Sequence, residues 1–256
     1  MNMQTGKRQL QNKVAVITGA NSGLGKCIAN NLADAGMCLV LSGRHVSRLD
    51  AVALELSGRG TQVEAVAGDV RDELFCEQLI ARAMTRFGAI DVLVNNAGTI
   101  DREPLISTTT AEWKRVMETN VDSVFYMCRG AIPHMREEGT IINVASTVSY
   151  LGAANLVAYC TSKGAVATFT KALAIELAEQ KITVNAVAPG AMTTPMLISE
   201  HKPGTTVESI YESNRATIPQ SRLAEPEEVA RAVRFLAEET HLTGSILSID
   251  GGYTAQ

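Results

Sequence analysis

Seven short apolar runs alternate with longer segments of helical spacing along nearly the whole 256-residue chain. The runs are continuously apolar, which predicts strands that are covered on both faces of a sheet. Strands that alternate with helices predict βαβ units with right-handed crossovers, and therefore a parallel sheet with helices on both faces. We expect one doubly wound α/β domain over residues 1–256, with strands at 13–18, 38–43, 63–68, 91–96, 140–145, 182–188 and 245–250.

One long segment, residues 191–225, departs from this alternation. It contains three prolines, one glycine and many polar residues. Open α/β sheets bind ligands at the carboxyl ends of their strands. We therefore expect this segment to fold over that edge of the sheet as a mobile lid.

Composition excludes several classes of function. The 23 basic and 27 acidic side chains give a net charge of -4, and aromatic residues make up only 4%. These values argue against a generally basic nucleic-acid binder and against a base-stacking surface. No apolar run reaches the ~20 residues that span a bilayer, and the polar start lacks the apolar core of a signal peptide. The five cysteines are scattered without a CxxC pair, and the four histidines are equally scattered. We expect a cytoplasmic protein with no metal site, no membrane partner and no nucleic-acid partner.

A glycine-rich turn follows the first expected strand and precedes a helical segment. Its glycines allow a tight turn and a close approach of the backbone to a pyrophosphate. The helix N-terminus that follows offers free N–H groups and the positive end of the helix dipole. Because the turn lies between a strand and a helix, it predicts a dinucleotide site, with an ordinary βα turn as the alternative. The expected cofactor-binding residues of this turn are Gly19, Asn21, Ser22, Gly23, Leu24 and Gly25.

Three polar side chains between residues 146 and 163 suggest chemistry. Tyr159 and Lys163 are four residues apart in a helical segment, so they share one face about 6 Å apart along the axis. A free tyrosine has a pKa near ~10, and a neighbouring ammonium favours its phenolate. The pair predicts an acid–base couple, with surface decoration as the alternative. Ser146 ends an apolar strand, where open sheets bind ligands, and a helix cap is the alternative role.

The motifs together resemble the ordinary single-domain branch of the short-chain dehydrogenase/reductase family, from about residue 12 to the end. The resemblance implies a Rossmann fold and hydride transfer between a nicotinamide cofactor and a ketone or alcohol. It also implies that Asn120, Ser146, Tyr159 and Lys163 are the catalytic residues. The motifs that carry it are Gly19-x-x-x-Gly23-x-Gly25, Asn95-Asn96-Ala97-Gly98, Asn120, Ser146, Tyr159-x-x-x-Lys163, Pro189-Gly190 with Thr194, and Asp250-Gly251-Gly252.

The resemblance also implies a role for each catalytic residue. Tyr159 exchanges a proton with the substrate oxygen, and Ser146 donates a hydrogen bond to that oxygen. Lys163 lowers the pKa of Tyr159 and binds the nicotinamide ribose. Asn120 holds a water that links Lys163 to solvent.

The end of the second expected strand decides between the two nicotinamide cofactors. Dinucleotide enzymes often place an acid there for the ribose 2′-OH, whereas this chain has Gly43 followed by Arg44. A guanidinium binds phosphate bidentately, so we predict NADP(H) over NAD(H), with a merely solvated Arg44 as the alternative. The resemblance assigns adenine binding to Asp69 and the carboxamide to Met192 and Thr194. The further cofactor-binding residues are Arg44, from its charge, and those that the resemblance implies: Val70, Asn96, Ala97, Gly98, Tyr159, Lys163, Pro189 and Gly190.

The substrate is less constrained by the sequence. The chain resembles 3-oxoacyl carrier-protein reductases, whose acidic partner needs basic residues near the active-site mouth. The aligned positions here are Glu137 and Gln180, which count against such a partner. We expect a small to medium ketone or secondary alcohol in a pocket walled by Val148, Tyr150, Leu151, Asn155, Leu156 and Met196.

Several other functions stay open at this stage. One group is NAD(H)-dependent sugar, polyol or hydroxy-acid dehydrogenases, and another is the carrier-protein reductases. An isomerase or dehydratase can also use this fold, and so can a cofactor-sensing binding protein. A sensor would be expected to have lost the tyrosine or the lysine, and this chain has both.

Two expected helices, at about 108–137 and 156–179, carry apolar residues on more than one face. The sheet can bury only one face of each helix. The second apolar face therefore predicts another subunit, and two-fold helix packing is the common arrangement. We expect a symmetric homotetramer.

Overall fold

The computed structural model describes residues 6–199 and 204–256. Seven strands form a single sheet in which every neighbouring pair is parallel. The strands are β1 Val14–Ile17, β2 Cys38–Gly43, β3 Val63–Ala67, β4 Ile90–Asn95, β5 Met135–Val144, β6 Thr183–Pro189 and β7 Ile246–Ile249. Their order across the sheet is β3-β2-β1-β4-β5-β6-β7. The strand order reverses between β1 and β4, which is where open α/β sheets form a ligand crevice.

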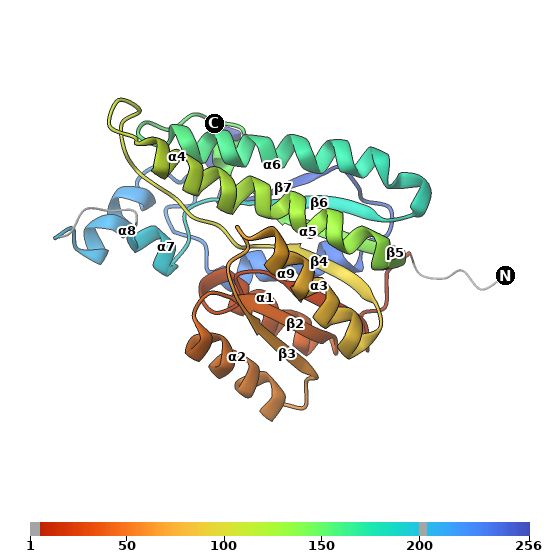
Figure 1. The fold of residues 1–256 in the computed structure, drawn as a ribbon. Coiled ribbons are helices and arrows are strands. Elements are labelled where there is room, and N and C mark those ends of the chain that lie inside the picture. The colour runs from red at the N-terminus through yellow and green to blue at the C-terminus, as the bar shows by residue number, and fades with distance from the viewer. Residues whose placement is uncertain (1–5, 200–203) are drawn as a thin grey trace.

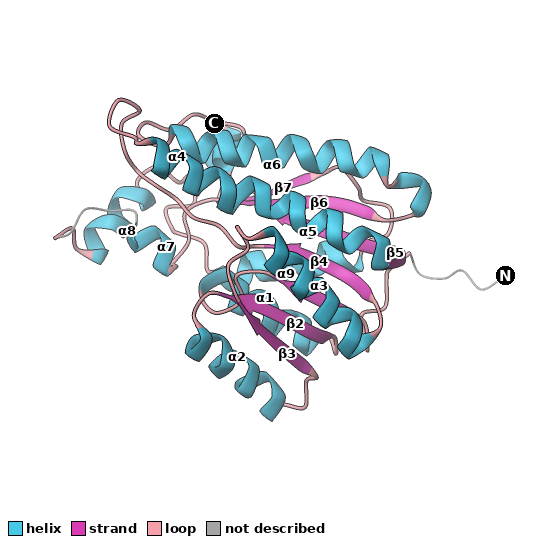
Figure 2. Cartoon of the chain, viewed as in Figure 1, coloured by secondary structure: helices cyan, strands magenta, loops and turns pink. Residues whose placement is uncertain are grey.

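Helices cover both faces of this sheet (Figures 1 and 2). One face packs against α3 (Glu73–Phe87), α5 (Ser123–Ala131) and α6 (Val157–Glu176). The other face packs against α1 (Gly23–Asp34), α2 (Val46–Gly58) and α9 (Pro226–Glu238). The predicted doubly wound α/β architecture is therefore confirmed. Within the described ranges, no helix combines the length and the apolar character needed to cross a membrane.

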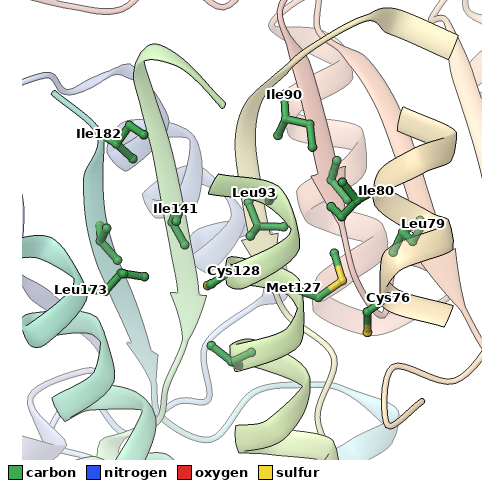
Figure 3. Close-up of a cluster of buried hydrophobic side chains, with 14 of the residues drawn as sticks. Cys76, Leu79, Ile80, Ile90, Leu93, Met127, Cys128, Ile141, Leu173 and Ile182 are labelled. Atoms are coloured by element: carbon green, nitrogen blue, oxygen red, sulfur yellow. The ribbon is translucent and has the colours of Figure 1, made fainter. Parts of the chain in front are cut away.

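Buried side chains from strands and helices interlock in both layers. Figure 3 shows part of the layer between the sheet and α3, α5 and α6. There β4 and β5 contribute wholly buried aliphatic residues, and the helices contribute the matching faces. Burial of a full aliphatic side chain stabilises the fold by roughly 1.5–3 kcal/mol, so this layer contributes strongly to holding the helices against the sheet. The labelled residues are Cys76, Leu79, Ile80, Ile90, Leu93, Met127, Cys128, Ile141, Leu173 and Ile182.

Local signals explain where α3 begins and ends. The Asp72 side chain accepts a hydrogen bond from the Leu74 N–H at 3.0 Å, which satisfies a helix N–H that has no partner within the helix. The helix ends at Gly88, whose φ of 75° lies in the left-handed region that glycine adopts without strain. Asp72 and Gly88 are thus the sequence signals that begin and end this helix.

The expected helix at 108–137 differs from the observed structure in two ways. The helical run begins with α4 (Thr110–Met117), passes through a π-helical turn at Glu118–Asp122 and continues as α5. It ends in a 3-10 turn at Ile132–His134, after which Met135 already pairs with Ile90 as the start of β5. After Met135, the residues Arg136, Glu137 and Glu138 of β5 are polar and exposed, so the apolar pattern did not reveal this part of the strand. The expected helix at 156–179 is α6, followed by a 3-10 turn at Ala178–Gln180.

The expected lid segment contains two short helices, α7 (Pro195–Ser199) and α8 (Val207–Arg215). Figure 1 shows both helices to the left of the sheet. Residues 200–203 of this segment lie outside the described residues.

Candidate active site

A cavity of about 600 Å³ opens at the carboxyl ends of the central strands. Its wall is formed by the turns after β1, β2, β3, β4, β5 and β6, together with residues of α6, α7 and α8. Every predicted catalytic or cofactor-binding residue except Asn120 lines this one cavity. These residues are Gly19, Asn21, Ser22, Gly23, Leu24, Gly25, Arg44, Asp69, Val70, Asn96, Ala97, Gly98, Ser146, Tyr159, Lys163, Pro189, Gly190, Met192 and Thr194.

The glycine turn after β1 leaves no room for a side chain at Gly25. A Cβ atom added to Gly25 would lie 2.2 Å from the Gly19 carbonyl oxygen and 2.5 Å from the Asn96 Nδ2 atom. That Nδ2 atom donates to the Thr18 carbonyl at 2.8 Å, which joins the end of β4 to the turn. Ser22 is the N-cap of α1, and its side chain makes no capping hydrogen bond. The turn thus presents backbone and a helix N-terminus to the cavity, a cradle that fits the pyrophosphate of a dinucleotide.

Positive charge surrounds the end of β2. Arg44, His45 and Arg48 are exposed, and all three line the cavity at the start of α2. Neither arginine forms an ion pair with any other described residue, so both guanidinium groups are available for an anion. The neighbouring Gly43 is also confined, since a Cβ atom there would lie 2.3 Å from the Asn21 Oδ1 atom.

Asp69 supplies a carboxylate at the end of β3. It accepts hydrogen bonds from the Arg71 backbone N–H at 3.0 Å and from the Arg71 guanidinium at 3.0 and 2.6 Å. The Arg71 hydrogen bonds lower the pKa of Asp69, and the charge of Arg44 acts in the same direction. Asp69 is therefore an ionised acceptor on the cavity wall.

Tyr159 and Lys163 lie on the face of α6 that meets the cavity. The Lys163 Nζ atom is 5.8 Å from the centroid of the Tyr159 ring, so the predicted pairing on one helix face is present. Lys163 is only 4% exposed, and its ammonium donates to the Val144 carbonyl at 2.7 Å. Burial lowers the pKa of Lys163 to about 8, because the low-dielectric surroundings disfavour the charged form.

The lowered pKa of Lys163 should make the unfolding free energy depend on pH. Between pH 8 and about 10.5 the unfolded chain keeps the Lys163 proton that the folded chain has lost, so unfolding free energy rises with pH. The full rise is about 3 kcal/mol, at ~1.36 kcal/mol per pKa unit. Cysteines with a raised pKa lower the unfolding free energy over the upper part of this range. We therefore expect denaturant titrations at fixed protein concentration, without nucleotide, to show the unfolding free energy of the wild type rising relative to that of Lys163→Met. Lys171→Met, at an exposed lysine of α6, is the control that should follow the wild type. A pH dependence shared by wild type and Lys163→Met would contradict the assignment.

Ser146 holds both of the positions considered from the sequence. It follows β5 and lines the cavity, and it is also the N-cap of the 3-10 turn Thr147–Ser149. Its Oγ atom accepts from the Val148 N–H at 3.5 Å, a long bond that leaves the hydroxyl proton for another acceptor.

Asn120 lies within the π-helical turn Glu118–Asp122 and does not line the cavity. Its Oδ1 atom accepts from the Thr99 N–H at 2.8 Å. Its Nδ2 atom donates to the Thr99 carbonyl at 2.8 Å and to the Ser162 hydroxyl at 2.9 Å. The Asn120 side chain therefore fixes the loop after β4 against α6, and its polar atoms are engaged by protein groups.

The far end of the cavity is formed by the chain after β6. A Cβ atom on Gly190 would lie 3.1 Å from the Asp250 Cα atom, so the turn packs directly on the chain after β7. The Thr194 N–H donates to the Met192 carbonyl at 2.8 Å, which turns the chain toward α7. Thr194 is buried beside Gly23, at the opening of α1.

The structure corrects the predicted substrate wall. Val148, Leu156 and Met196 line the cavity, whereas Tyr150, Leu151 and Asn155 do not. The Tyr150 hydroxyl instead donates to the Ile246 carbonyl at 3.0 Å, which directs the side chain toward β7. Sequence reasoning missed His45, Arg48, Ile100, Arg102, Ser213, Asn214, Thr217, Ile218 and Tyr253, all of which line the cavity. Of these, Arg48 had a signal, since it follows Arg44 at helical spacing.

Comparison with known proteins agrees with this geometry. A family model described as "Enoyl-(Acyl carrier protein) reductase" matches residues 19–254. The chain is 39% identical over 252 residues to a cis-4-hydroxycyclohexanecarboxylate dehydrogenase from Sinomonas cyclohexanicum, covering 95% of this chain and 97% of that protein. It is 36% identical over 248 residues to the 3-oxoacyl-[acyl-carrier-protein] reductase FabG of Thermotoga maritima, covering 95% and 98%.

A solved structure shows the same fold. The actinorhodin polyketide ketoreductase, crystallised with NADPH, superposes with a TM-score of 0.91 at 34% identity and covers 96% of this chain and 98% of that one. The chain belongs to the short-chain dehydrogenase/reductase family. It is a pyridine-nucleotide oxidoreductase that acts on CH–OH or keto groups. Among the described residues, no cluster of three or more histidines, cysteines or acids could hold a metal ion.

Proposed function

We propose that this family member is an NADP(H)-dependent carbonyl reductase or alcohol dehydrogenase for a small to medium ketone or secondary alcohol. One observation carries the proposal. One cavity is lined by the glycine turn after β1, by Arg44 and Arg48, by Ser146 and by the Tyr159–Lys163 pair. A cofactor-sensing protein would need the cradle but not the acid–base pair.

The proposed chemistry uses three side chains of this chain at the substrate oxygen. When bound, the nicotinamide supplies or accepts a hydride at the substrate carbon. Tyr159 gives its phenolic proton to the carbonyl oxygen in reduction and takes the alcohol proton in oxidation. Ser146 donates a hydrogen bond to the same oxygen and holds it beside the phenol. The Lys163 ammonium, 5.8 Å from the centroid of the Tyr159 ring, favours the phenolate and would bind the nicotinamide ribose.

Asn120 has a different place in this proposal from the one that the resemblance implies. Both polar atoms of its side chain already have partners in Thr99 and Ser162, and a water relay to Lys163 is proposed to use backbone groups near Asn120. The π-helical turn at Glu118–Asp122 widens the helix at this point, and such turns are frequent at functional sites. The side chain then acts by holding that turn in place.

The proposed preference for NADP(H) rests on the charge around β2. Arg44 and Arg48 line the cavity without an ion-pair partner among the described residues, and no acid follows Gly43. The structural relative crystallised with NADPH supports the same choice. The remaining proposed cofactor contacts are those of the glycine turn, Asp69 with Val70, the floor Asn96-Ala97-Gly98, and the run from Pro189 to Thr194.

The proposed substrate is a free small molecule rather than an acyl carrier protein. Lys181 pairs with Glu137 at 2.6 Å, and Arg136 lies 3.5 Å from Asp91, so the basic residues near the aligned positions are neutralised. The cavity wall beyond Tyr159 mixes apolar side chains with the polar Ser213, Asn214 and Thr217. The relative from Sinomonas cyclohexanicum is named as a dehydrogenase of cis-4-hydroxycyclohexanecarboxylate, a small molecule of the size proposed here.

A turnover screen tests the proposed function. Purified protein is mixed with NADPH and a panel of aliphatic, cyclic and carboxylated ketones, and oxidation is followed at the nicotinamide absorbance band. The reverse panel uses NADP with the matching alcohols. Turnover of at least one ketone supports the proposal, whereas tight NADPH binding with no turnover across both panels would favour the cofactor-sensing protein.

We also propose a single domain over residues 1–256, with a lid at 191–225, that assembles as a cytoplasmic homotetramer. Large apolar side chains remain exposed on α5 and α6, among them Phe125 at 43%, Val157 at 40% and Ile175 at 80%. Exposed apolar surface on adjacent helices favours two-fold packing with another copy.

We expect light scattering at micromolar concentration to give four times the 27.3 kDa chain mass. A stable monomer under those conditions would refute the assembly.

A further inference from the structure

Ser149 lies three residues after Ser146, in the 3-10 turn that follows β5. Its half-buried hydroxyl makes two hydrogen bonds to residues of the proposed catalytic set. The Oγ atom donates to the backbone carbonyl of Lys163 at 2.9 Å. The same atom accepts from the backbone N–H of Ser146 at 3.3 Å. One side chain therefore bridges the Ser146 turn and the middle of α6.

A second connection joins α6 to the end of β5, just before the Ser146 turn, but it uses the Lys163 ammonium, which has a further role in the proposed function. The Lys163 ammonium donates to the Val144 carbonyl, at the end of β5. In the proposed function this ammonium also turns to the nicotinamide ribose. The Ser149 bridge uses only the backbone of Lys163, so it persists whichever partner the ammonium has.

We infer that Ser149 is a positioning residue that holds the Ser146 hydroxyl at the correct distance from Tyr159. The inference rests on the proposed catalytic roles of those two residues. Ser146 and Tyr159 must meet the same substrate oxygen, yet they come from different elements, a turn after β5 and a helix. Reacting groups need placement to within about 0.5 Å, and a shift of ~1 Å can cost up to ~10²-fold in rate. Among the described contacts, the Ser149 hydroxyl joins these two elements directly.

Kinetics of three variants test the inference, using NADPH and the ketone that the turnover screen identifies. Ser149→Ala removes both hydrogen bonds and is expected to lower kcat about five- to twentyfold, with the KM for NADPH unchanged. Ser149→Thr keeps the hydroxyl and is expected to restore most of the rate. In a Ser146→Ala background, adding Ser149→Ala is expected to cost less than about twofold, because its effect passes through Ser146.

Thr240→Ala is the matched control. It also removes a hydroxyl that donates to a backbone carbonyl at 2.9 Å, from Thr240 to Gly6, away from the cavity. It should leave kcat unchanged. A Ser149→Ala loss of equal size with and without Ser146 overturns the inference, and so does an unchanged kcat in Ser149→Ala. If Ser146→Ala and Tyr159→Phe themselves keep wild-type rates, the proposed function fails instead.

A crystal structure of Ser149→Ala gives an answer that needs no substrate. The turn Thr147–Ser149 and Ser146 are expected to move relative to α6, while α6 keeps its packing on the sheet. A turn that stays in place without the hydroxyl would overturn the inference.

Discussion

Tyr159→Phe is expected to lower kcat by at least ~10²-fold, the usual scale for loss of a general acid or base. The substitution removes one oxygen from the cavity wall and keeps the ring that lies 5.8 Å from the Lys163 ammonium. Helix α6 and the packing of Lys163 against Val144 should therefore be preserved. Because the phenol acts on the substrate oxygen, the KM for NADPH should change little. Steady-state kinetics with the best ketone of the screen give both values.

Tyr126→Phe is the matched control for this change. Tyr126 lies on α5, packs against the buried cluster beneath the sheet and does not line the cavity. Loss of its hydroxyl should leave kcat within experimental error of the wild type. If Tyr159→Phe retained more than about a tenth of wild-type activity, Tyr159 would not be the acid–base group. The proton would then have to come from another cavity residue or from water.

The sheet could be predicted because its signal is local and repeated. Each strand from β1 to β7 carries a short apolar run. In β1, β2, β4 and β6 burial on both faces makes that run continuous, whereas the edge strands β3 and β7 are only partly buried. The start of β5 was missed for the same physical reason. Its polar residues Arg136, Glu137 and Glu138 are exposed, and pairing with β4 at Ile90 extends the strand without any apolar pattern.

The cavity could be predicted only where its wall follows a strand end. Gly19, Arg44, Asp69, Ser146 and Gly190 each come after a strand, and parallel strands bring their carboxyl ends to one edge. Residues that reach the cavity from other parts of the chain do not follow a strand, so their place in the wall could not be predicted in this way. Asn214 and Thr217 come from α8 and the chain after it, and Tyr253 comes from the C-terminal turn.

Side-chain direction was a further limit of sequence reasoning. Tyr150 is four residues from Ser146 and was expected in the substrate wall, but its hydroxyl bonds to Ile246 of β7. Asn120 was expected to face the site, yet the π-helical turn and the two bonds to Thr99 hold it beneath the floor. A π-helical turn keeps the helical apolar pattern on either side, so the sequence gives no sign of it.

Arg44→Ala is expected to raise the KM for NADPH roughly ten- to a hundredfold and to leave the KM for NADH nearly unchanged. A hydrogen bond to a charged group contributes about 1.5–3 kcal/mol, and only NADPH carries the 2′-phosphate that Arg44 would bind. Arg44 is exposed, so the difference between variant and wild type should shrink as salt rises. Kinetics with both cofactors at low and high ionic strength measure each effect. Arg59→Ala, just after α2 and away from the cavity, is the matched control and should change neither KM.

An acidic side chain at the end of β2 should change the cofactor preference more than Arg44→Ala does, toward NADH. The position of that acid decides whether the site survives. A side chain at Gly43 would collide with Asn21, 2.3 Å from the added Cβ atom, and would disturb the phosphate cradle itself. Arg44→Asp avoids this collision, offers an acceptor to a 2′-OH and repels a 2′-phosphate. It should therefore raise the KM for NADPH more than Arg44→Ala does and lower the KM for NADH. Equal losses with both cofactors in Arg44→Ala would mean that Arg44 stacks on adenine or supports the loop, and the preference for NADP(H) would then have to come from Arg48 alone.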